Sequence, residues 1–300
     1  MDPGRYKTIT TGRGLVYNYY ASPAQPGKHT LLFLHGYPST SGDWATFVAF
    51  FEARGHGAIV PDLLGFGGTD KPTDVQLYVS TGLVDDVRDI LDAEKVDKVV
   101  VIGHDCNYTE TVVQMTSQLG YTPFGYWLFF SGDADLAMKT HIDSFISVIY
   151  PLDPKTWITK FAPVGALQKA LDDGFSTPLP SYITNEHVEK WKQTFLTNGF
   201  SAPNQWYAVM LSGFEAIDEY NKDIPPEHEF PAQNAPIFFA AAEEDYICTP
   251  GMAEAVWSLP EFKDHKITKK SYAADHWVIF SKAEQMCVDL EEWLGQVTAM

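Results

Sequence analysis

The chain has 300 residues, 45% of them hydrophobic, and a formal net charge of −18 at pH 7. This length suits one large α/β domain or a core with an insertion, and the apolar content supports a large core. The negative charge argues against nucleic acid and anionic membrane surfaces as partners, because both are polyanions.

Cysteine usage and the chain ends indicate the compartment. The three cysteines, Cys106, Cys248 and Cys287, are too few for a disulfide framework, and their spacing fits no metal site. The first residues lack an apolar secretory segment, no run is long enough to span a bilayer, and the last residues match no simple targeting tail. We therefore expect a cytoplasmic protein without a bound metal.

The first third of the chain alternates between strand-like and helix-like segments. Strand composition occurs at residues 16–20, 30–34 and 58–60, and helical patterns occur at 43–51 and 80–93. This order predicts a doubly wound, mostly parallel α/β sheet.

The sequence His35-Gly36-Tyr37-Pro38 follows the strand at 30–34 directly. The bent backbone of such a loop, often with a cis X-Pro bond, can aim the N–H of Tyr37 into a site. A glycine/proline turn without a function is the alternative. The glycine-rich loop at 61–70 lacks the lysine and the glycine spacing of phosphate-binding loops, so we expect it to be structural.

A β-branched run at 99–102 predicts a strand buried on both faces, and a helical pattern follows at 109–119. Such a fast strand-to-helix turn strains the backbone of its central residue and requires small flanking residues. Gly103-His104-Asp105-Cys106-Asn107 matches the nucleophile elbow of α/β-hydrolases, with Asp105 as the nucleophile. An ordinary turn with an aspartate helix cap is the alternative.

Residues 135–229 carry helical patterns that prolines interrupt repeatedly, and they are rich in large aromatic side chains. No run typical of a buried strand occurs there. We expect a helical cap at 135–229, inserted into an α/β-hydrolase core formed by residues 1–134 and 230–300. Most of the aromatic residues should form the core of the cap, with a few facing the active site.

Two further residues follow predicted strands, Asp245 after 235–241 and His276 after 266–268. The carboxyl ends of the strands converge in open α/β sheets, so Asp105, Asp245 and His276 can meet. A helix cap for Asp245 and a surface position for His276 are the alternatives.

A carboxylate nucleophile restricts the chemistry. Attack by Asp105 on an acyl group would give an anhydride, whereas attack on an sp³ carbon gives an alkyl ester that histidine-activated water can cleave. The constellation therefore predicts the opening of an epoxide or the displacement of a halide.

Four segments resemble the soluble epoxide hydrolase family of the α/β-hydrolases: His35–Pro38, Gly103–Asp105, Ala242–Tyr246 and Asp275–Trp277. The resemblance implies a small apolar epoxide and water as partners, a vicinal diol as product, and no cofactor. It implies Asp105 as the nucleophile, His276 as the base and Asp245 as the acid that orients it.

The segment 198–207 resembles the part of that family that bears a ring-opening tyrosine, which implies that Tyr207 donates a hydrogen bond or a proton to the epoxide oxygen. The family uses a second cap tyrosine. Ser147 stands at the matching position, with Tyr150 about one helical turn away, so the partner of Tyr207 is Tyr150 or none. Cys106 replaces the usual tryptophan after the nucleophile and is expected to offer its backbone N–H.

The residues expected to contact substrate come from the loops that follow the strands and from the cap. They are Tyr37, Cys106, His35, Pro38, Trp206 and Trp277.

Two other functions stay open at this point. A hydrolytic dehalogenase shares the triad but stabilises halide with side-chain N–H donors, which neither Tyr37 nor Cys106 supplies. A ligand-binding protein on the same fold with little turnover is the second alternative. A homodimer is compatible with the sequence.

Overall fold

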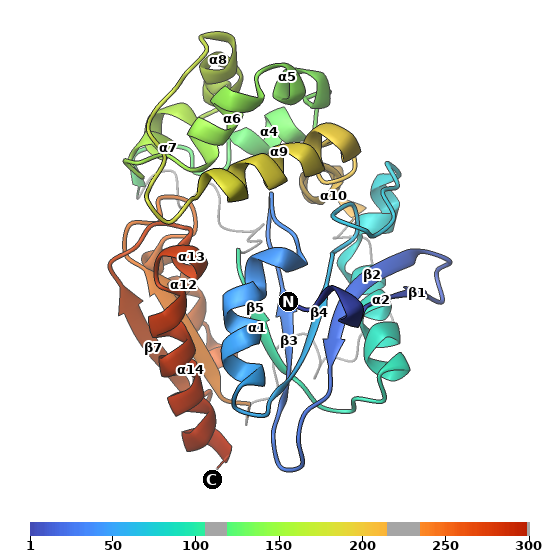
Figure 1. Ribbon diagram of the computed structural model, residues 1–300. Coiled ribbons are helices and arrows are strands. Elements are labelled where there is room, and N and C mark those ends of the chain that lie inside the picture. Colours follow the sequence, from blue (N-terminus) through green and yellow to red (C-terminus); the bar gives the residue numbers. More distant parts are fainter. Residues whose placement is uncertain (106–118, 215–234, 299–300) are drawn as a thin grey trace. The chain divides into compact units, whose positions relative to one another are not determined.

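The structure, a computed structural model, describes residues 1–105, 119–214 and 235–298 (Figure 1). Cys106, nearly all of the predicted helix at 109–119 and the end of the predicted cap at 215–229 lie outside the described residues. Within them the chain forms two compact units. Residues 1–105, 130–139 and 189–214 belong to the first unit, and residues 119–129, 140–188 and 235–298 belong to the second.

The first unit is built on a five-stranded sheet. Its strands are β1 (Tyr6–Thr10), β2 (Val16–Ser22), β3 (Thr30–Leu34), β4 (Gly57–Pro61) and β5 (Val100–Gly103). Its helices are η1 (Pro3–Arg5), η2 (Ser41–Trp44), α1 (Ala45–Glu52), η3 (Val75–Tyr78), α2 (Ser80–Ala93), α10 (Gln205–Ser212), most of α5 (Asp135–Thr140) and the end of α9 (Asn185–Asn198).

The strand order is β1-β2-β4-β3-β5, drawn as blue to green arrows in Figure 1. β3 runs parallel to β4 and β5, with Leu32 paired to Ile59 on one side and to Val101 on the other. β1 and β2 are antiparallel additions at the far edge. Because β3 and β5 are parallel neighbours, the loop after Leu34 and the loop after Gly103 both begin at the carboxyl ends of the strands, side by side.

Helices cover both faces of this sheet, as predicted. Phe33 packs on the side of α1, with its ring 5.1 Å from Trp44 and 6.3 Å from Phe47. Its neighbour Leu32 points the other way and joins a buried cluster with Ile59 and with Ile90 of α2. This alternation is the period-two pattern of a strand that is covered on both faces.

The prediction that β5 is buried on both faces is wrong for the described residues. Its exposure alternates along the strand, and the side chain of Val101 is 58% exposed. β5 is the last strand of the sheet, so β3 is its only hydrogen-bonded neighbour among the described strands. An apolar β-branched run indicates a strand but does not specify which elements cover it.

The second unit has a sheet of two parallel strands, β6 (Ile237–Ala242) and β7 (Ile267–Tyr272). Its helices are α4 (Tyr126–Phe130), α6 (Ile142–Ile149), α7 (Thr156–Lys160), α8 (Ala166–Asp172), α12 (Pro250–Trp257), η6 (Pro260–Phe262), α13 (Val278–Ser281), α14 (Ala283–Thr298) and the start of α9.

The predicted sheet does not continue as one hydrogen-bonded ladder through the described residues, because β6 and β7 pair only with each other there. The apolar run at 126–130 would suit a strand, but it forms the helix α4. A Cβ atom at Gly125 would lie 2.6 Å from the carbonyl oxygen of Ala162, so the chain passes closely over the turn after α7. This close packing fixes the start of α4.

The described part of residues 135–229 contains helices and no strand, as its sequence pattern predicts. The assignment of 135–229 to a cap stays a prediction, because each compact unit includes part of this stretch. None of the described helices is both long and apolar enough to cross a bilayer.

A buried carboxylate organises the glycine-rich loop after β4. Asp62 is 4% exposed and accepts hydrogen bonds from the N–H of Ser41 (2.9 Å), the N–H of Gly68 (2.8 Å) and Nδ2 of Asn18 (2.8 Å). Burial alone would raise the pKa of Asp62, but the N–H groups of Gly68 and Ser41 lower it overall. The loop therefore has the structural role that we expected.

We predict that Asp62→Asn lowers the free energy of unfolding by about 2 kcal/mol, because the amide NH₂ would face backbone donors. Urea unfolding at pH 7 measures the change. The exposed Asp97→Asn is the matched control and should change stability by less than ~0.5 kcal/mol. Equal stability of the two variants would contradict the role of Asp62.

Acid unfolding gives a second check. Because the pKa of Asp62 is lowered in the folded state, its stabilisation is present above the pKa of an unfolded aspartate and disappears as the pH falls through the folded value. Asp62→Asn should therefore lose less stability on acidification than the wild-type chain.

Candidate active site

His35 holds the loop after β3 in place. Its Nε2 accepts the N–H of Leu63 (3.0 Å), so its Nδ1 carries the proton and donates to the carbonyl oxygen of Gly36 (2.8 Å). Burial lowers the pKa of His35, which keeps the ring neutral. Both ring nitrogens are thus used within the protein, and contact of His35 with substrate stays a prediction.

Asp105 follows β5 with a φ of +77°, in the left-handed region that non-glycine residues rarely adopt. The predicted strained geometry at the centre of the elbow is thereby confirmed. The N–H of Tyr37 points at Oδ2 of Asp105 across 3.4 Å. The Tyr37–Pro38 peptide bond is cis, as expected.

Gly36 makes this approach possible. A Cβ atom at Gly36 would lie 2.9 Å from both Oδ2 of Asp105 and the carbonyl oxygen of His104, and closer still to Cβ of Asp105. Any larger residue would push the loop after β3 away from the carboxylate.

The side chain of Tyr37 points toward α10. Its ring lies edge-on to the ring of Tyr207 at 5.0 Å, and Phe130 contacts Tyr207 at 4.9 Å. The hydroxyl of Tyr37 donates to Oδ1 of Asn204 (2.8 Å), the residue that precedes α10. Tyr37 thus faces Asp105 with its backbone and the buried Tyr207 with its ring, all within the first unit.

Two other predicted substrate contacts have polar groups that are engaged within the protein. The indole N–H of Trp206 donates to the carbonyl oxygen of Leu64 (2.8 Å). The carbonyl oxygen of Pro38 accepts the indole N–H of Trp191 (2.9 Å). These bonds join α10 to the glycine-rich loop and α9 to the loop after β3.

The second unit holds the other predicted catalytic pair. Nδ1 of His276 lies 2.8 Å from Oδ2 of Asp245, and Oδ1 of Asp245 accepts the N–H groups of Ile247 (2.8 Å) and Cys248 (2.9 Å). Burial alone would raise the pKa of Asp245, but His276 and the two N–H groups lower it overall. Asp245 stays ionised and can orient His276, whose Nδ1 then carries the proton.

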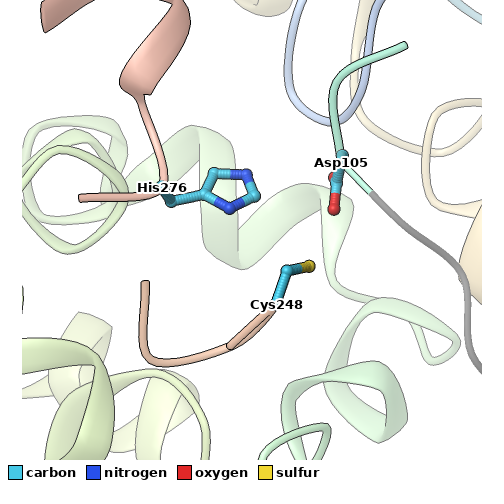
Figure 2. A group of neighbouring side chains, drawn as sticks. All are labelled: Asp105, Cys248 and His276. Carbon is cyan, nitrogen blue, oxygen red and sulfur yellow. The ribbon is translucent and has the colours of Figure 1, made fainter. Parts of the chain in front are cut away.

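Aromatic side chains and one thiol surround His276 within this unit. The rings of Trp157 and Trp277 lie 5.1 Å from the imidazole. Figure 2 draws Cys248 and His276, which come from the loops after β6 and β7, and Sγ of Cys248 is within 4.8 Å of a ring nitrogen of His276. Asp105, also labelled there, belongs to the first unit.

The two predicted cap tyrosines belong to different units. Tyr150 follows α6, is 1% exposed and packs its ring at 4.6 Å on Trp277, whose indole N–H donates to the carbonyl oxygen of Ile149 (2.8 Å). It therefore lies near His276, whereas Tyr207 lies near Tyr37.

Several residues around His276 were not predicted from the sequence. The ring of Tyr126 stacks on Phe161 at 4.1 Å, and the ring of Phe161 lies 5.0 Å from Trp157. Trp157 in turn contacts the imidazole of His276. Trp157 and Phe161 carried no signal beyond aromatic content, because nothing in a single sequence distinguishes a core aromatic residue from one beside a site. Cys248, adjacent to the Asp245 motif, was the one residue whose position could have indicated proximity.

Comparison with known proteins agrees with this architecture. The family profile described as alpha/beta hydrolase fold matches residues 29–106. Epoxide hydrolase 2 from Siraitia grosvenorii is 40% identical over 105 residues, 35% of this chain and 32% of that protein. That match spans about a third of the relative's length. Epoxide hydrolase 1 from the same plant is 26% identical over 234 residues, 70% of this chain and 74% of the relative.

Solved structures extend the likeness to nearly the whole chain. Epoxide hydrolase A from Mycobacterium thermoresistibile superposes with a TM-score of 0.74 at 19% identity, covering 96% of this chain and 97% of that one. An epoxide hydrolase from Vigna radiata gives 0.73 at 18% identity, covering 97% and 98%. The chain has the α/β-hydrolase fold, as predicted. The predicted resemblance to epoxide hydrolases is confirmed, because these relatives and neighbours all carry that name.

We predict that Gly36→Ala destabilises the chain by ~1–3 kcal/mol, because the added methyl overlaps Asp105. Thermal and urea unfolding measure the loss. Gly12→Ala is the control, since its Cβ would meet the nearest side-chain oxygen at an ordinary 3.4 Å. A Gly36→Ala variant as stable as the Gly12→Ala variant would show that the close approach imposes no constraint.

Proposed function

We propose that this chain hydrolyses epoxides to vicinal diols through a covalent ester on Asp105. The observation that carries the proposal is the arrangement at Tyr37, whose N–H faces the Asp105 carboxylate while its ring packs against the phenol-bearing Tyr207. A carboxylate nucleophile with a nearby phenol suits a reaction in which an alkoxide leaves an sp³ carbon. The names of the relatives support the same chemistry.

In the first step a carboxylate oxygen of Asp105 attacks an epoxide carbon, and the C–O bond breaks with its electron pair on oxygen. The phenol of Tyr207 donates a proton to that oxygen, because an alkoxide is too basic to leave without a donor. The product of this step is a hydroxyalkyl ester on Asp105.

In the second step His276 takes a proton from water, and the resulting hydroxide attacks the ester carbonyl carbon. Asp245, 2.8 Å from Nδ1, stabilises the imidazolium that forms. The N–H of Tyr37 stabilises the negative oxygen of the tetrahedral intermediate. When the intermediate collapses, the ester C–O bond breaks and the departing diol oxygen takes the proton from His276. Asp105 is left as a carboxylic acid, and loss of its proton restores both the Asp105 carboxylate and the phenol of Tyr207.

The dehalogenase alternative is disfavoured by the indole N–H groups. A halide needs side-chain N–H donors, and four tryptophans near the predicted site residues use theirs internally. Trp157, Trp191, Trp206 and Trp277 donate to the carbonyl oxygens of Val148, Pro38, Leu64 and Ile149. These donors are not directed at a leaving group, whereas phenols are at hand for an alkoxide.

A cytoplasmic location and the choice between monomer and homodimer stay predictions. Cys248 and Cys287 form no disulfide with any described residue, which is consistent with a reducing compartment.

His276→Gln should allow ester formation but block ester hydrolysis, because the base is absent only in the second step. An aryl epoxide added to this variant should therefore yield an adduct visible by intact mass. Asp245→Asn should hydrolyse the ester slowly, since the base remains but is less well oriented. Asp105→Asn is the control and should form no adduct.

An independent readout is a single turnover in H₂¹⁸O. Water attacks the ester carbonyl, so one ¹⁸O atom should enter the Asp105 carboxylate and be found in its peptide. Label in the diol alone would mean direct attack of water on the epoxide and would refute the ester mechanism.

Tyr207→Phe should slow ester formation by ~10²–10³, the usual effect of removing one donor aimed at a developing oxyanion. Rapid-quench measurement of the adduct checks this value. Tyr150→Phe, made in parallel, tests the second donor: it should slow ester formation by a comparable factor if two phenols share the epoxide oxygen, and should have a negligible effect if Tyr207 acts alone. Wild-type ester formation in Tyr207→Phe would exclude the cap assignment.

A further inference from the structure

A second carboxylate stands beside His276. Asp275 directly precedes it in the chain, and its Oδ1 accepts the N–H of Trp277 (3.0 Å). Its Oδ2 accepts a hydrogen bond from the hydroxyl of Tyr182. Both oxygens of Asp275 are thus engaged, one by the residue after His276 and the other by a residue 93 positions away in the chain.

Tyr182 is itself held in a defined place. It lies in a turn closed by the N–H of Ile183 on the carbonyl oxygen of Pro180 (3.0 Å), just before α9 begins at Asn185. On the other side of the loop, the N–H of Glu244 donates to the carbonyl oxygen of Ala274 (2.9 Å). The loop that carries His276 is therefore attached to the end of β6 and to the turn before α9.

We propose that Asp275, held by Tyr182, is a positioning residue that fixes the orientation and the charge state of His276. The inference rests on the proposed function, because it assigns Asp275 to the step in which His276 takes a proton from water. Within the described residues of the second unit, the ionisable groups that interact with His276 include Asp245 at 2.8 Å, the thiol of Cys248 and the adjacent Asp275, whose carboxylate is attracted to the imidazole. Asp245 orients the ring through Nδ1, and Asp275 adds a second negative charge beside it.

The negative charge of Asp275 determines in which direction the pKa of His276 should move when a partner is removed. A carboxylate beside an imidazole favours the imidazolium and raises the pKa of the histidine. Burial raises the pKa of Asp275 even though Tyr182 donates to it, so loss of the phenol would make the carboxylate still harder to keep ionised. Removal of either partner should therefore lower the pKa of His276.

The test is an NMR titration of ¹⁵N-histidine-labelled protein, with His276→Gln used to assign the signal. Asp275→Asn should lower the pKa of His276 by about half a unit to one unit, and Tyr182→Phe should lower it less. Tyr272→Phe is the matched control, because it removes another tyrosine–aspartate hydrogen bond of the same unit, to Asp289 (2.7 Å), and should leave His276 unchanged. Tyr182→Phe keeps the test valid if Asp275→Asn folds poorly.

Kinetics supply the second readout. Both variants should hydrolyse the ester about three- to tenfold more slowly, with the acidic limb of that step shifted to lower pH and ester formation unchanged. An unchanged His276 titration together with an unchanged hydrolysis step in both variants would overturn the proposal. If the wild-type chain opens no epoxide, the proposed function fails, yet the titration still decides whether Asp275 and Tyr182 control His276.

Discussion

The close approach of Gly36 to Asp105 is the constraint on which the first unit depends. The chain leaves β5 with a left-handed residue at Asp105 and leaves β3 through a glycine, because no Cβ fits between the two loops. Once the loops are this close, the N–H of Tyr37 faces the carboxylate and the ring of Tyr37 faces α10. Tyr37 therefore contributes a backbone donor beside Asp105 and a ring against which Tyr207 packs.

Buried polar groups hold the loop after β3 and the glycine-rich loop after β4 in place. His35, kept neutral by burial, bonds to Gly36 and to the N–H of Leu63, while ionised Asp62 collects the donors around the glycine-rich loop. Each group is in the protonation state that its partners require, since a neutral ring can both donate and accept and a carboxylate can accept several N–H groups. Such networks are costly to break, which favours a rigid support for the strained Asp105.

Local elements could be predicted well from the sequence. The strand β3 and the helix α2 have the predicted bounds, because β-branched runs and 3.6-residue periodicity are local properties. The exposure of Val101 and the separate pairing of β6 and β7 could not be predicted, since composition does not specify which strand or helix becomes the neighbour.

Prediction of the candidate site from the sequence was limited in the same way. The motifs around Asp105, Asp245 and His276 were recognisable because each joins a strand end to a reactive side chain. The contact of Tyr182 with Asp275 was not, because the two residues are far apart in the chain and Tyr182 belongs to no motif. Long-range partners of a catalytic residue follow from tertiary packing, which one sequence does not encode in any local pattern.

The two units divide the proposed chemistry in a way that accounts for the second carboxylate. The groups assigned to ester formation, Asp105 and Tyr207, belong to the first unit, and those assigned to ester hydrolysis, His276 and Asp245, belong to the second. Only hydrolysis creates a positive charge on the imidazole, so a negative charge beside His276 stabilises that step and leaves the first unaffected. A carboxylate next to the base is therefore useful where Asp275 stands, whereas the same charge beside Asp105 would oppose an anionic nucleophile and its developing alkoxide.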